Sequence, residues 1–213
     1  MFKLGVINDE VSQDFATVVN FVKDFNLHSI EIRSVWDKLP HELTDTDIDE
    51  IKRLLDGTDI EIIGVASPFF KCDMDNAAER KEHLGILEGC IRTAKAFDTN
   101  LIRTFVFWDT GETEARWDEI IASYDEPRRM IDGEGIVLGM ENESTTSLRT
   151  AKLTAEFIPL LCAKNSGIAK GQTLLVARKK CMERSCFQVQ KRDFGERSTL
   201  FRRSFIANGL GDC

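Results

Sequence analysis

Residues 135–143 read GIVLGMENE, and the rest of the chain is best interpreted by working outward from this stretch. A glycine opens it, a short apolar run follows, and it closes with Glu141, Asn142 and Glu143. A short apolar run bounded by turn residues is typical of a buried strand in a parallel sheet. Carboxylates at the C-terminal end of such a strand lie where α/β folds place their chemistry. We therefore predict a buried strand here, with Glu141 as a candidate functional residue.

Four similar strand patterns precede this stretch, and a helical pattern separates each strand from the next. The predicted strands cover residues 3–8, 28–33, 59–66 and 101–108. Helices are predicted to begin at Ser12, at Thr44 or Thr46, and at Asp75. One or two helices are predicted within residues 112–132, where Pro127 should bend or split the segment. A fifth helix begins within residues 147–157. Five βα units in succession predict parallel strands joined by right-handed crossovers.

Two architectures fit such units, an open doubly wound sheet and a (β/α)₈ barrel. The glycine motifs of nucleotide-binding open sheets are absent, because the sequence contains neither GxGxxG after the first strand nor a Walker loop. Alternation within the strands favours the barrel. Glu31 and Arg33 share one face of their strand, and Arg103 and Glu141 each place a charge on one face of theirs. Such faces suit a barrel interior near its mouth, so we predict an α/β fold of TIM-barrel type.

The composition suits one soluble α/β domain with a sizeable core, since 42% of the 213 residues are hydrophobic and 30% are charged. No apolar run approaches the length of a membrane span, and the first residues show no signal-peptide pattern. The six cysteines include no CxxC pair. We therefore expect a reduced, cytoplasmic protein.

The charge is distributed unevenly along the chain. Residues 158–213 contain 11 Lys+Arg and 4 Asp+Glu, which gives +7, so the remainder has 28 − 11 = 17 basic and 36 − 4 = 32 acidic residues, or −15. We therefore predict a partial barrel domain over residues 1–157 and an unmatched basic tail over residues 158–213. The tail contains one possible strand, TLLVA, at residues 173–177. We interpret the tail as frameshifted or disordered sequence; the alternative is a basic arm that binds nucleic acid or acidic surfaces.

Four segments, taken in order, resemble the xylose-isomerase-like TIM-barrel superfamily of sugar and sugar-phosphate isomerases and epimerases. They are HSIEIR at 28–33, VASPFFKCD at 65–73, AKAFDTNLIRTFVFW at 94–108 and EGIVLGMENE at 134–143. The resemblance covers residues 1–157. It implies a divalent metal (Mn, Mg or Co) at the C-terminal mouth of the barrel and a sugar or sugar phosphate as substrate. In this family the metal stabilises the enediolate oxygens, while a carboxylate moves a proton between carbons.

The same resemblance implies four metal ligands: a Glu on the fifth strand, an Asp on the sixth, a His on the seventh and a Glu on the eighth. Glu141 matches the first. No apolar strand ending in Asp follows residue 157, and no histidine follows His83. A single carboxylate holds Mg²⁺ or Mn²⁺ weakly, and TIM barrels typically need about 250 residues. We therefore expect an incomplete metal site and weak or no activity for this chain alone.

The candidate residues each have a structural alternative. Glu141 is the candidate catalytic residue and metal ligand, but it could simply pair with Arg103 or Arg33. Glu31 and Arg33 are candidate substrate-binding residues that could instead form an interior ion pair. Arg103 could contact a phosphate or carboxylate of the substrate, or pair with a strand carboxylate. Trp108 could form an aromatic wall for a sugar ring, or pack within its loop.

Two other functions compete with the isomerase interpretation. A non-catalytic half-barrel could persist as a binding or interaction fragment, and its unpaired edge strands could form a homodimer. An endonuclease-IV-type barrel would need histidines at the ends of the third and fourth strands, where this chain has Ser67-Pro68-Phe69 and Phe107-Trp108. The acidic body also opposes binding to nucleic acid.

Overall fold

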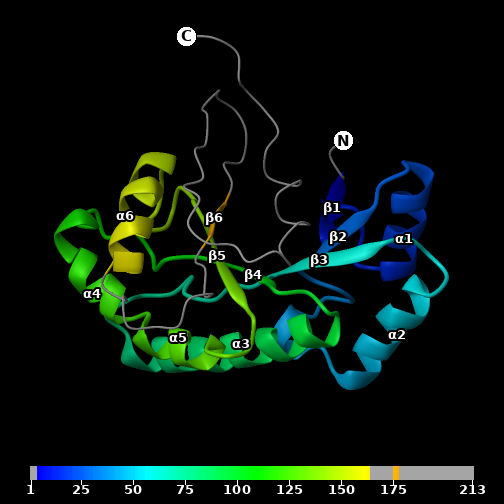
Figure 1. The fold of residues 1–213 in the computed structure, drawn as a ribbon, viewed down its shortest axis with the longest axis horizontal. Helices are drawn as coiled ribbons and strands as arrows, with labels where there is room; N and C mark the ends of the chain where they lie inside the picture. The colour runs from blue at the N-terminus through cyan, green and yellow to red at the C-terminus, as the bar shows by residue number, and fades with distance from the viewer. Residues whose placement is uncertain (1–3, 164–174, 178–213) are drawn as a thin grey trace, which may run out of the picture.

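A single parallel sheet of six strands organises the molecule. The computed structural model describes residues 4–163 and 175–177, with side chains described as far as residue 161. Every strand pairs in parallel with the next one in sequence (Figure 1). A sheet in sequential order is the order of a barrel, whereas doubly wound sheets reverse their order. The prediction of a partial TIM-type barrel is therefore confirmed. The strands are β1 (Gly5–Ile7), β2 (Ser29–Ile32), β3 (Glu61–Ala66), β4 (Leu101–Thr104), β5 (Val137–Glu141) and β6 (Leu175–Ala177).

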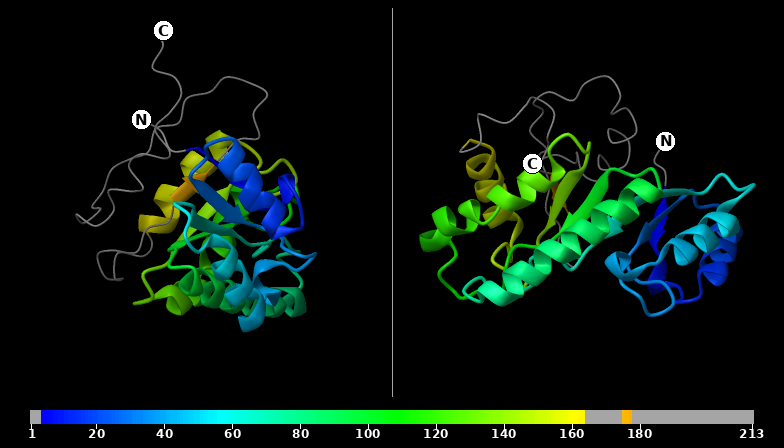
Figure 2. Two further views of the ribbon diagram at one scale, coloured as in Figure 1. Left: turned by 90° about the vertical axis from the view of Figure 1, so that its right-hand side faces the viewer. Right: turned by 90° about the horizontal axis from the view of Figure 1, so that it is seen from below.

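The helices form an outer layer that follows the sheet in an arc, as Figures 1 and 2 show. Short 3₁₀ turns lie between some of the strands and helices, and none of the described helices is both long and apolar enough to cross a membrane. The helices are α1 (Phe15–Asp24), α2 (Asp45–Leu55), α3 (Ala77–Ala96), α4 (Trp117–Ala122), α5 (Asp125–Ile131) and α6 (Ala151–Ala163), and the 3₁₀ turns are η1 (Asn8–Glu10), η2 (Pro40–Glu42) and η3 (Glu114–Arg116).

The first two helices begin at side-chain caps. The prediction of Thr44 is confirmed, since its hydroxyl accepts from the Asp47 N–H while the Asp47 carboxylate accepts from the Thr44 N–H. The prediction of Ser12 is wrong. Asp14 caps α1 by accepting from the Thr17 N–H at 3.0 Å, and the Ser12 hydroxyl accepts from the Asp14 N–H. The Ser12 side chain therefore forms part of the turn that leads into the helix.

Helix α3 also begins one residue later than predicted. Asn76 is its cap and accepts from two backbone N–H groups, while the Asp75 carboxylate forms an ion pair with Arg116. Asp and Asn are both favourable N-cap residues. The local sequence does not show that the Asp75 carboxylate pairs with a distant arginine and is therefore not the cap.

The segment predicted to be broken by Pro127 is indeed two helices. The break lies at Ser123 and Tyr124, however, and Pro127 is the third residue of α5. A proline is tolerated in a first helical turn because the N–H groups there have no intrahelical partner. Pro127 therefore helps to begin α5 and does not itself divide the segment.

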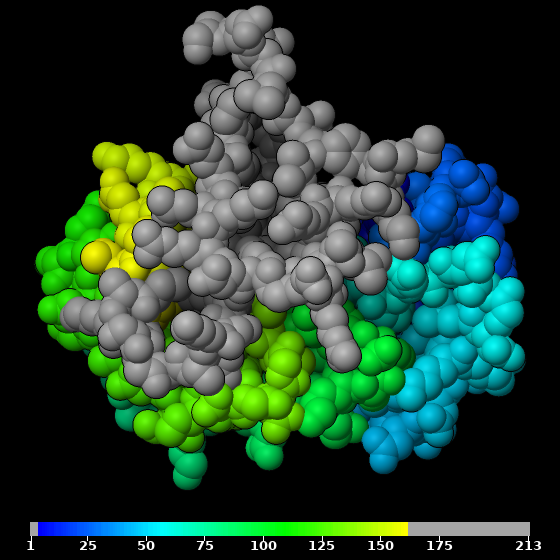
Figure 3. Space-filling view, in the orientation of Figure 1, coloured from blue at the N-terminus to red at the C-terminus, as the bar shows by residue number. Residues whose placement is uncertain are grey.

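Two apolar clusters fill the space between the sheet and the helices. One contains Ile30 and Ile32 of β2 with the inner faces of α1 and α2. The other contains Leu138 and Met140 of β5 with side chains from α3 to α6. In Figure 3 the blue-to-cyan elements of the first cluster and the green-to-yellow elements of the second occupy opposite ends of the molecule. The apolar faces of these two strands therefore lie against the helices, and the alternating faces that carry Glu31 and Glu141 point the other way.

Helix α6 and strand β6 continue the βα pattern beyond residue 157. Helix α6 runs to Ala163, and β6 lies within the predicted TLLVA strand and pairs in parallel with β5. The predicted domain boundary at residue 157 stays a prediction. The remaining predictions for the basic tail fall on residues 164–174 and 178–213, which lie outside the described residues.

Candidate functional site

Arg103 lies at the centre of a charged cluster that joins three strands. Its Nε donates to Glu31 Oε1 at 2.6 Å, and its Nη1 donates to Glu141 Oε2. The side chains of Arg103, Glu31 and Glu141 are only 10%, 16% and 17% exposed. The structure thus brings together three of the predicted site residues. Glu141 and Arg103 form an ion pair with each other, which was the structural alternative to a catalytic or substrate-binding role.

Strand register and small residues explain how Arg103 reaches both carboxylates. Arg103 is in register with Ala66 on β3 and with Gly139 on β5, and Glu31 is in register with Gly64. Residues in register on parallel strands point to the same face of the sheet. Two glycines and an alanine therefore share the face of the charged side chains. Because these residues occupy so little volume, the guanidinium can extend over β3 to Glu31.

One nitrogen of the Arg103 guanidinium has no partner among the described residues. Nη2 is buried and donates no hydrogen bond within the part of the chain that the structure describes. Nη2 is bonded to the same carbon as the two nitrogens that hold Glu31 and Glu141, so a group bound there would lie next to both carboxylates. A buried donor without an acceptor costs free energy. An acceptor oxygen of a ligand would remove this cost.

A second charged group lies after the ends of β3 and β5. The Lys71 ammonium lies 2.6 Å from Glu143 Oε2, and it lies over the rings of Phe105 and Trp108 at 4.7 and 5.5 Å from their centroids. The Thr145 hydroxyl donates to the other oxygen of Glu143. Burial raises the pKa of Glu143, but the interactions with Lys71 and Thr145 outweigh burial and lower this pKa below its usual value. Glu143 is therefore held as a carboxylate.

Backbone contacts between neighbouring loops fix the position of Trp108. Its N–H donates to the Cys72 carbonyl at 3.0 Å, and it forms an antiparallel bridge with Thr146. The next residue, Asp109, accepts from Arg149 Nη1 at 3.0 Å. The segments that follow β3, β4 and β5 are thus linked to one another. The indole remains 38% exposed at the predicted position, after the C-terminal end of β4.

The predicted alternative for Glu31 and Arg33, an ion pair between the two, is wrong. Arg33 Nε lies 2.8 Å from Asp9 Oδ1, and Arg33 Nη1 lies 3.3 Å from Glu10 Oε1. The Arg33 N–H also donates to Asn8 Oδ1. Glu31 is occupied by Arg103, whereas Arg33 lies beyond the end of β2, where it meets η1.

Two features of this region were missed by sequence reasoning. The first is the cluster that Asn8, Asp9 and Glu10 form around Arg33; the sequence NDE directly after the first strand could have indicated it. The second is the position of Lys71. The one signal in the sequence was that Lys71 lies shortly after the end of the third strand, where the loops at the mouth of the barrel begin.

The described residues do not by themselves fit a divalent metal. Within this part of the chain no three His, Cys, Asp or Glu side chains gather in a way that could hold an ion. The nearest candidate, Glu141, already engages a guanidinium, which a metal would have to displace. Metal binding at Glu141 would therefore need further ligands from elsewhere.

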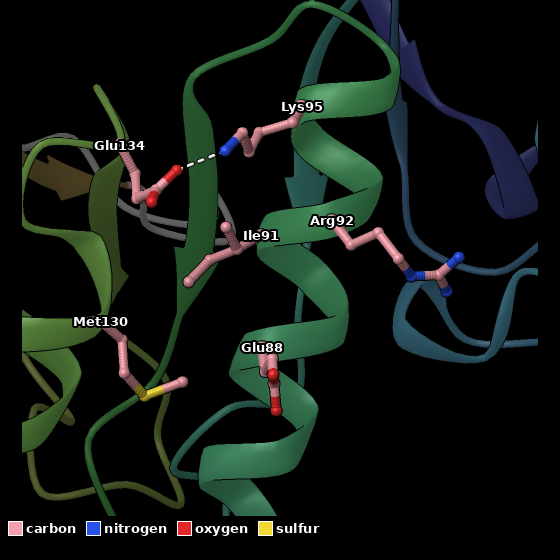
Figure 4. A pocket seen from close by; sticks show the side chains of 6 residues that line it. All are labelled: Glu88, Ile91, Arg92, Lys95, Met130 and Glu134. Carbon is pink, nitrogen blue, oxygen red and sulfur yellow. Dashed lines mark hydrogen bonds and ion pairs between the residues drawn. The ribbon is translucent and has the colours of Figure 1, made fainter.

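A groove on the outer helical layer is separate from these strand ends. It lies between α3 and α5 and has a volume of about 560 Å³ (Figure 4). Ile91 and Met130 provide apolar contacts, and an ion pair between Lys95 and Glu134 crosses it. Lys95 belongs to the last turn of α3, and Glu134 precedes β5. The Lys95–Glu134 ion pair therefore lies near the N-terminal ends of the strands, opposite the candidate site.

Comparisons with known proteins agree with this architecture. The sequence profile of the xylose isomerase-like TIM barrel family matches residues 19–168. No curated protein matches the chain. A xylose isomerase-like TIM barrel protein from Mycobacterium smegmatis, solved in complex with magnesium, has a TM-score of 0.57 at 16% identity; the match covers 76% of this chain and 61% of that one.

Two further solved structures give the same result. The IolI protein, solved with a bound zinc atom, has a TM-score of 0.60 at 16% identity and matches over 82% of this chain and 62% of its own length. A D-tagatose 3-epimerase-like protein has a TM-score of 0.60 at 17% identity, with 83% and 64% covered. These low identities show the fold alone. The chain spans less than two-thirds of the length of each of the three proteins.

The family assignment rests on the sequence profile, which extends over more than two-thirds of the residues. Its range contains the strands that carry Glu31, Arg103 and Glu141. This chain belongs to the xylose isomerase-like TIM barrel family.

Proposed function

We propose that this chain carries part of a sugar or sugar-phosphate isomerase or epimerase site, with Glu141 as the carboxylate that moves a proton. The observation that carries this proposal is the position of Arg103 between Glu31 and Glu141. Proton transfer next to a carbonyl needs a base and a group that stabilises the enediolate oxygen, and a carboxylate and the Arg103 guanidinium can supply these. The epimerase-like relative described above supports the same class of reaction.

The proposed chemistry uses groups of this chain alone. A ketose carbonyl oxygen accepts a hydrogen bond from Arg103 Nη2, which acidifies the neighbouring C–H bond. Glu141 takes that proton, and the electron pair of the C–H bond moves into an enediolate whose oxygen Arg103 stabilises. Glu141 then returns the proton to the same carbon or to its neighbour. Return by Glu141 to the same carbon regenerates the substrate. An epimer forms when a second proton donor, for which Glu31 is the candidate, protonates the opposite face of that carbon. An isomer forms when Glu141 protonates the neighbouring carbon while the hydroxyl proton moves to the former carbonyl oxygen.

We further propose that turnover by this chain is slow and that its affinity for Mn²⁺, Mg²⁺ or Co²⁺ is low. Glu141 is the one described residue that matches the expected ligand set. Its carboxylate is neutralised by Arg103, which competes with any ion for the same oxygen. Calorimetric titration with Mn²⁺ should show no tight stoichiometric site, and Glu141→Gln should remove the weak binding that remains. Sub-micromolar binding by the unmodified chain would contradict this part of the proposal.

Deuterium exchange tests the proton transfer directly, even where net turnover is slow. A ketose incubated with the full chain in D₂O should gain deuterium at the carbon next to its carbonyl, as followed by NMR. Glu141→Gln should reduce the exchange to the rate in buffer, because an amide cannot carry the proton. Exchange by the unmodified chain at the buffer rate would overturn the isomerase proposal. Ketose binding without exchange would identify the non-catalytic alternative, a barrel fragment that only binds its ligand.

The predicted homodimer and the predicted cytoplasmic location stay predictions. A membrane partner is not proposed. Nucleic acid is an unfavourable partner for the described surface because the carboxylates around Arg103 and Arg33 outnumber the cations there.

A further inference from the structure

We infer that the site around Arg103 takes a neutral, hydroxyl-rich sugar and disfavours the phosphate ester of the same sugar. This inference rests on the proposed function, because it concerns the ligand of that site. It goes further by choosing between two substrate classes that the family resemblance leaves open.

The described ion pairs around Arg103 carry more negative than positive charge. Arg33 pairs with Asp9 and Glu10, Arg103 with Glu31 and Glu141, Lys71 with Glu143, and Arg149 with Asp109. These four cations meet six carboxylates, so the four groups together have a formal charge of −2. A phosphate dianion would meet repulsion from this charge, and each cation it engaged would have to leave a carboxylate.

The donor that Arg103 retains favours a hydroxyl group beside the carbonyl. Arg103 is 9% exposed, and its Nη2 has no acceptor among the described residues. Nη2 carries two N–H groups, so a sugar can place its carbonyl oxygen on one and a hydroxyl oxygen on the other. The hydroxyl can also donate its own proton to Glu31 or Glu141. A phosphate oxygen in the place of the hydroxyl could only accept, and it would put negative charge beside two carboxylates.

The surface after the end of β4 is apolar and suits the C–H groups of a sugar. The indole of Trp108 is 38% exposed, while the Phe105 ring is largely buried beneath the Lys71 ammonium. The Trp108 ring offers an apolar face to the C–H groups of a sugar. Lys71 is already engaged by Glu143 and by both rings, so it offers no uncompensated charge to a phosphate.

A paired ligand titration of the full chain tests the inference without added metal. D-Fructose and D-fructose 6-phosphate, and D-tagatose and D-tagatose 6-phosphate, are titrated by ligand-observed NMR at low ionic strength. We expect each sugar to bind at least about tenfold more tightly than its phosphate ester, the size expected for two unit charges about 12 Å apart at an effective dielectric constant of about 20. Equal or tighter binding of the esters would overturn the inference and leave the proposed function standing. Binding of none of the four would overturn both.

A charge variant separates electrostatics from shape. Glu31→Gln keeps an acceptor for Arg103 but removes one negative charge, so the preference for the sugar over its ester should shrink several-fold. The matched control is Glu50→Gln, which removes the same charge from an exposed ion pair on α2 and should leave the preference unchanged. The comparison uses a ratio of affinities, which a general loss of folded protein would not change. An unchanged ratio in Glu31→Gln would show that the charge of the cluster does not select the ligand.

Discussion

Arg103 donates from Nε to Glu31 Oε1 at 2.6 Å although an entire strand, β3, separates the strands on which the two residues lie. Ion pairs in a parallel sheet are more easily made between adjacent strands. This longer reach depends on the small side chains of β3, and it makes one guanidinium the link between β2 and β5. The stability of the sheet should therefore respond strongly to its loss.

Replacing Arg103 by methionine should lower the free energy of unfolding substantially. The variant keeps most of the side-chain volume but leaves two carboxylates without their cation in a largely buried place. Removing one partner of a buried ion pair typically costs about 3–5 kcal/mol, and we expect a loss near the lower end because the carboxylates retain some exposure. Urea denaturation followed by circular dichroism measures the change.

The control for that experiment is Arg53→Met on α2. Arg53 pairs with Glu50 three residues earlier on the exposed face of the helix, where ion pairs contribute little. The midpoint of this variant should stay close to that of the unmodified chain. Equal midpoints for the two variants would mean that the Arg103 cluster does not stabilise the fold.

Protonation of His83 should destabilise the protein as the pH falls. The Phe70 N–H donates to His83 Nδ1 at 2.9 Å, and burial lowers the pKa of His83 below its ordinary value. The unfolded chain takes up this proton near pH 6.5, before the folded protein does, about where an unperturbed histidine titrates. The free energy of unfolding should therefore be highest above about pH 6.5 and should decrease as the pH falls toward the folded-state pKa.

Urea midpoints measured between pH 8 and pH 5 test this. His83→Gln should flatten the acid-side decrease, since glutamine can accept the Phe70 hydrogen bond without titrating. Part of the decrease should remain, because burial also lowers the pKa of His41. The matched control is His41→Gln, which should remove only the part of the decrease that comes from His41. An unchanged slope in His83→Gln would exclude His83 as its cause.

The single tyrosine of the chain should resist ionisation until the fold opens. Tyr124 is fully buried, its hydroxyl donates to the Phe105 carbonyl at 3.0 Å, and burial raises its pKa well above 10. Because the unfolded chain loses this proton near pH 10 while the folded protein keeps it, stability should decrease as the pH rises above about 10. Phenolate absorbance should therefore increase together with the loss of the circular dichroism signal.

Since no other tyrosine contributes, the absorbance change reports this residue alone. Tyr124→Phe should abolish the signal, and it should lower the free energy of unfolding by about 1–3 kcal/mol because it leaves the Phe105 carbonyl without its donor. Ionisation near pH 10 with an intact circular dichroism spectrum would show that the hydroxyl is accessible in the folded state.

The parts of the fold that the sequence predicts well are those with a regular period. The apolar run before Glu141 predicted a strand, which the structure ends at Glu141. Alternation in β2 and β5 correctly predicted that Glu31 and Glu141 lie on the face that also carries Arg103. Helix starts were less reliable. Asp75 and Ser12 are good caps by type, but each makes a different contact that local sequence does not reveal.

Within the candidate site, alternation correctly placed Arg103 and Glu141 where they can pair. Alternation did not predict the partners of Arg33. Those partners lie in the turn after β1, and the pairing of charges across strands depends on strand register. Lys71 was missed because it lies in an irregular segment, next to Phe70 with a φ of +59°. An irregular segment of this kind has no repeating sequence pattern from which its conformation could be predicted.

The small residues that share the face of the Arg103 cluster have an evolutionary consequence. Gly64, Ala66 and Gly139 contribute almost no volume, and the arginine at 103 uses the space that they leave. A larger side chain at Ala66 or Gly139, the two residues in register with Arg103, would force the guanidinium away from a carboxylate. Loss of Arg103 would leave a void beside two unpaired acids. Substitutions at residues 66, 103 and 139 are therefore expected to covary among related sequences.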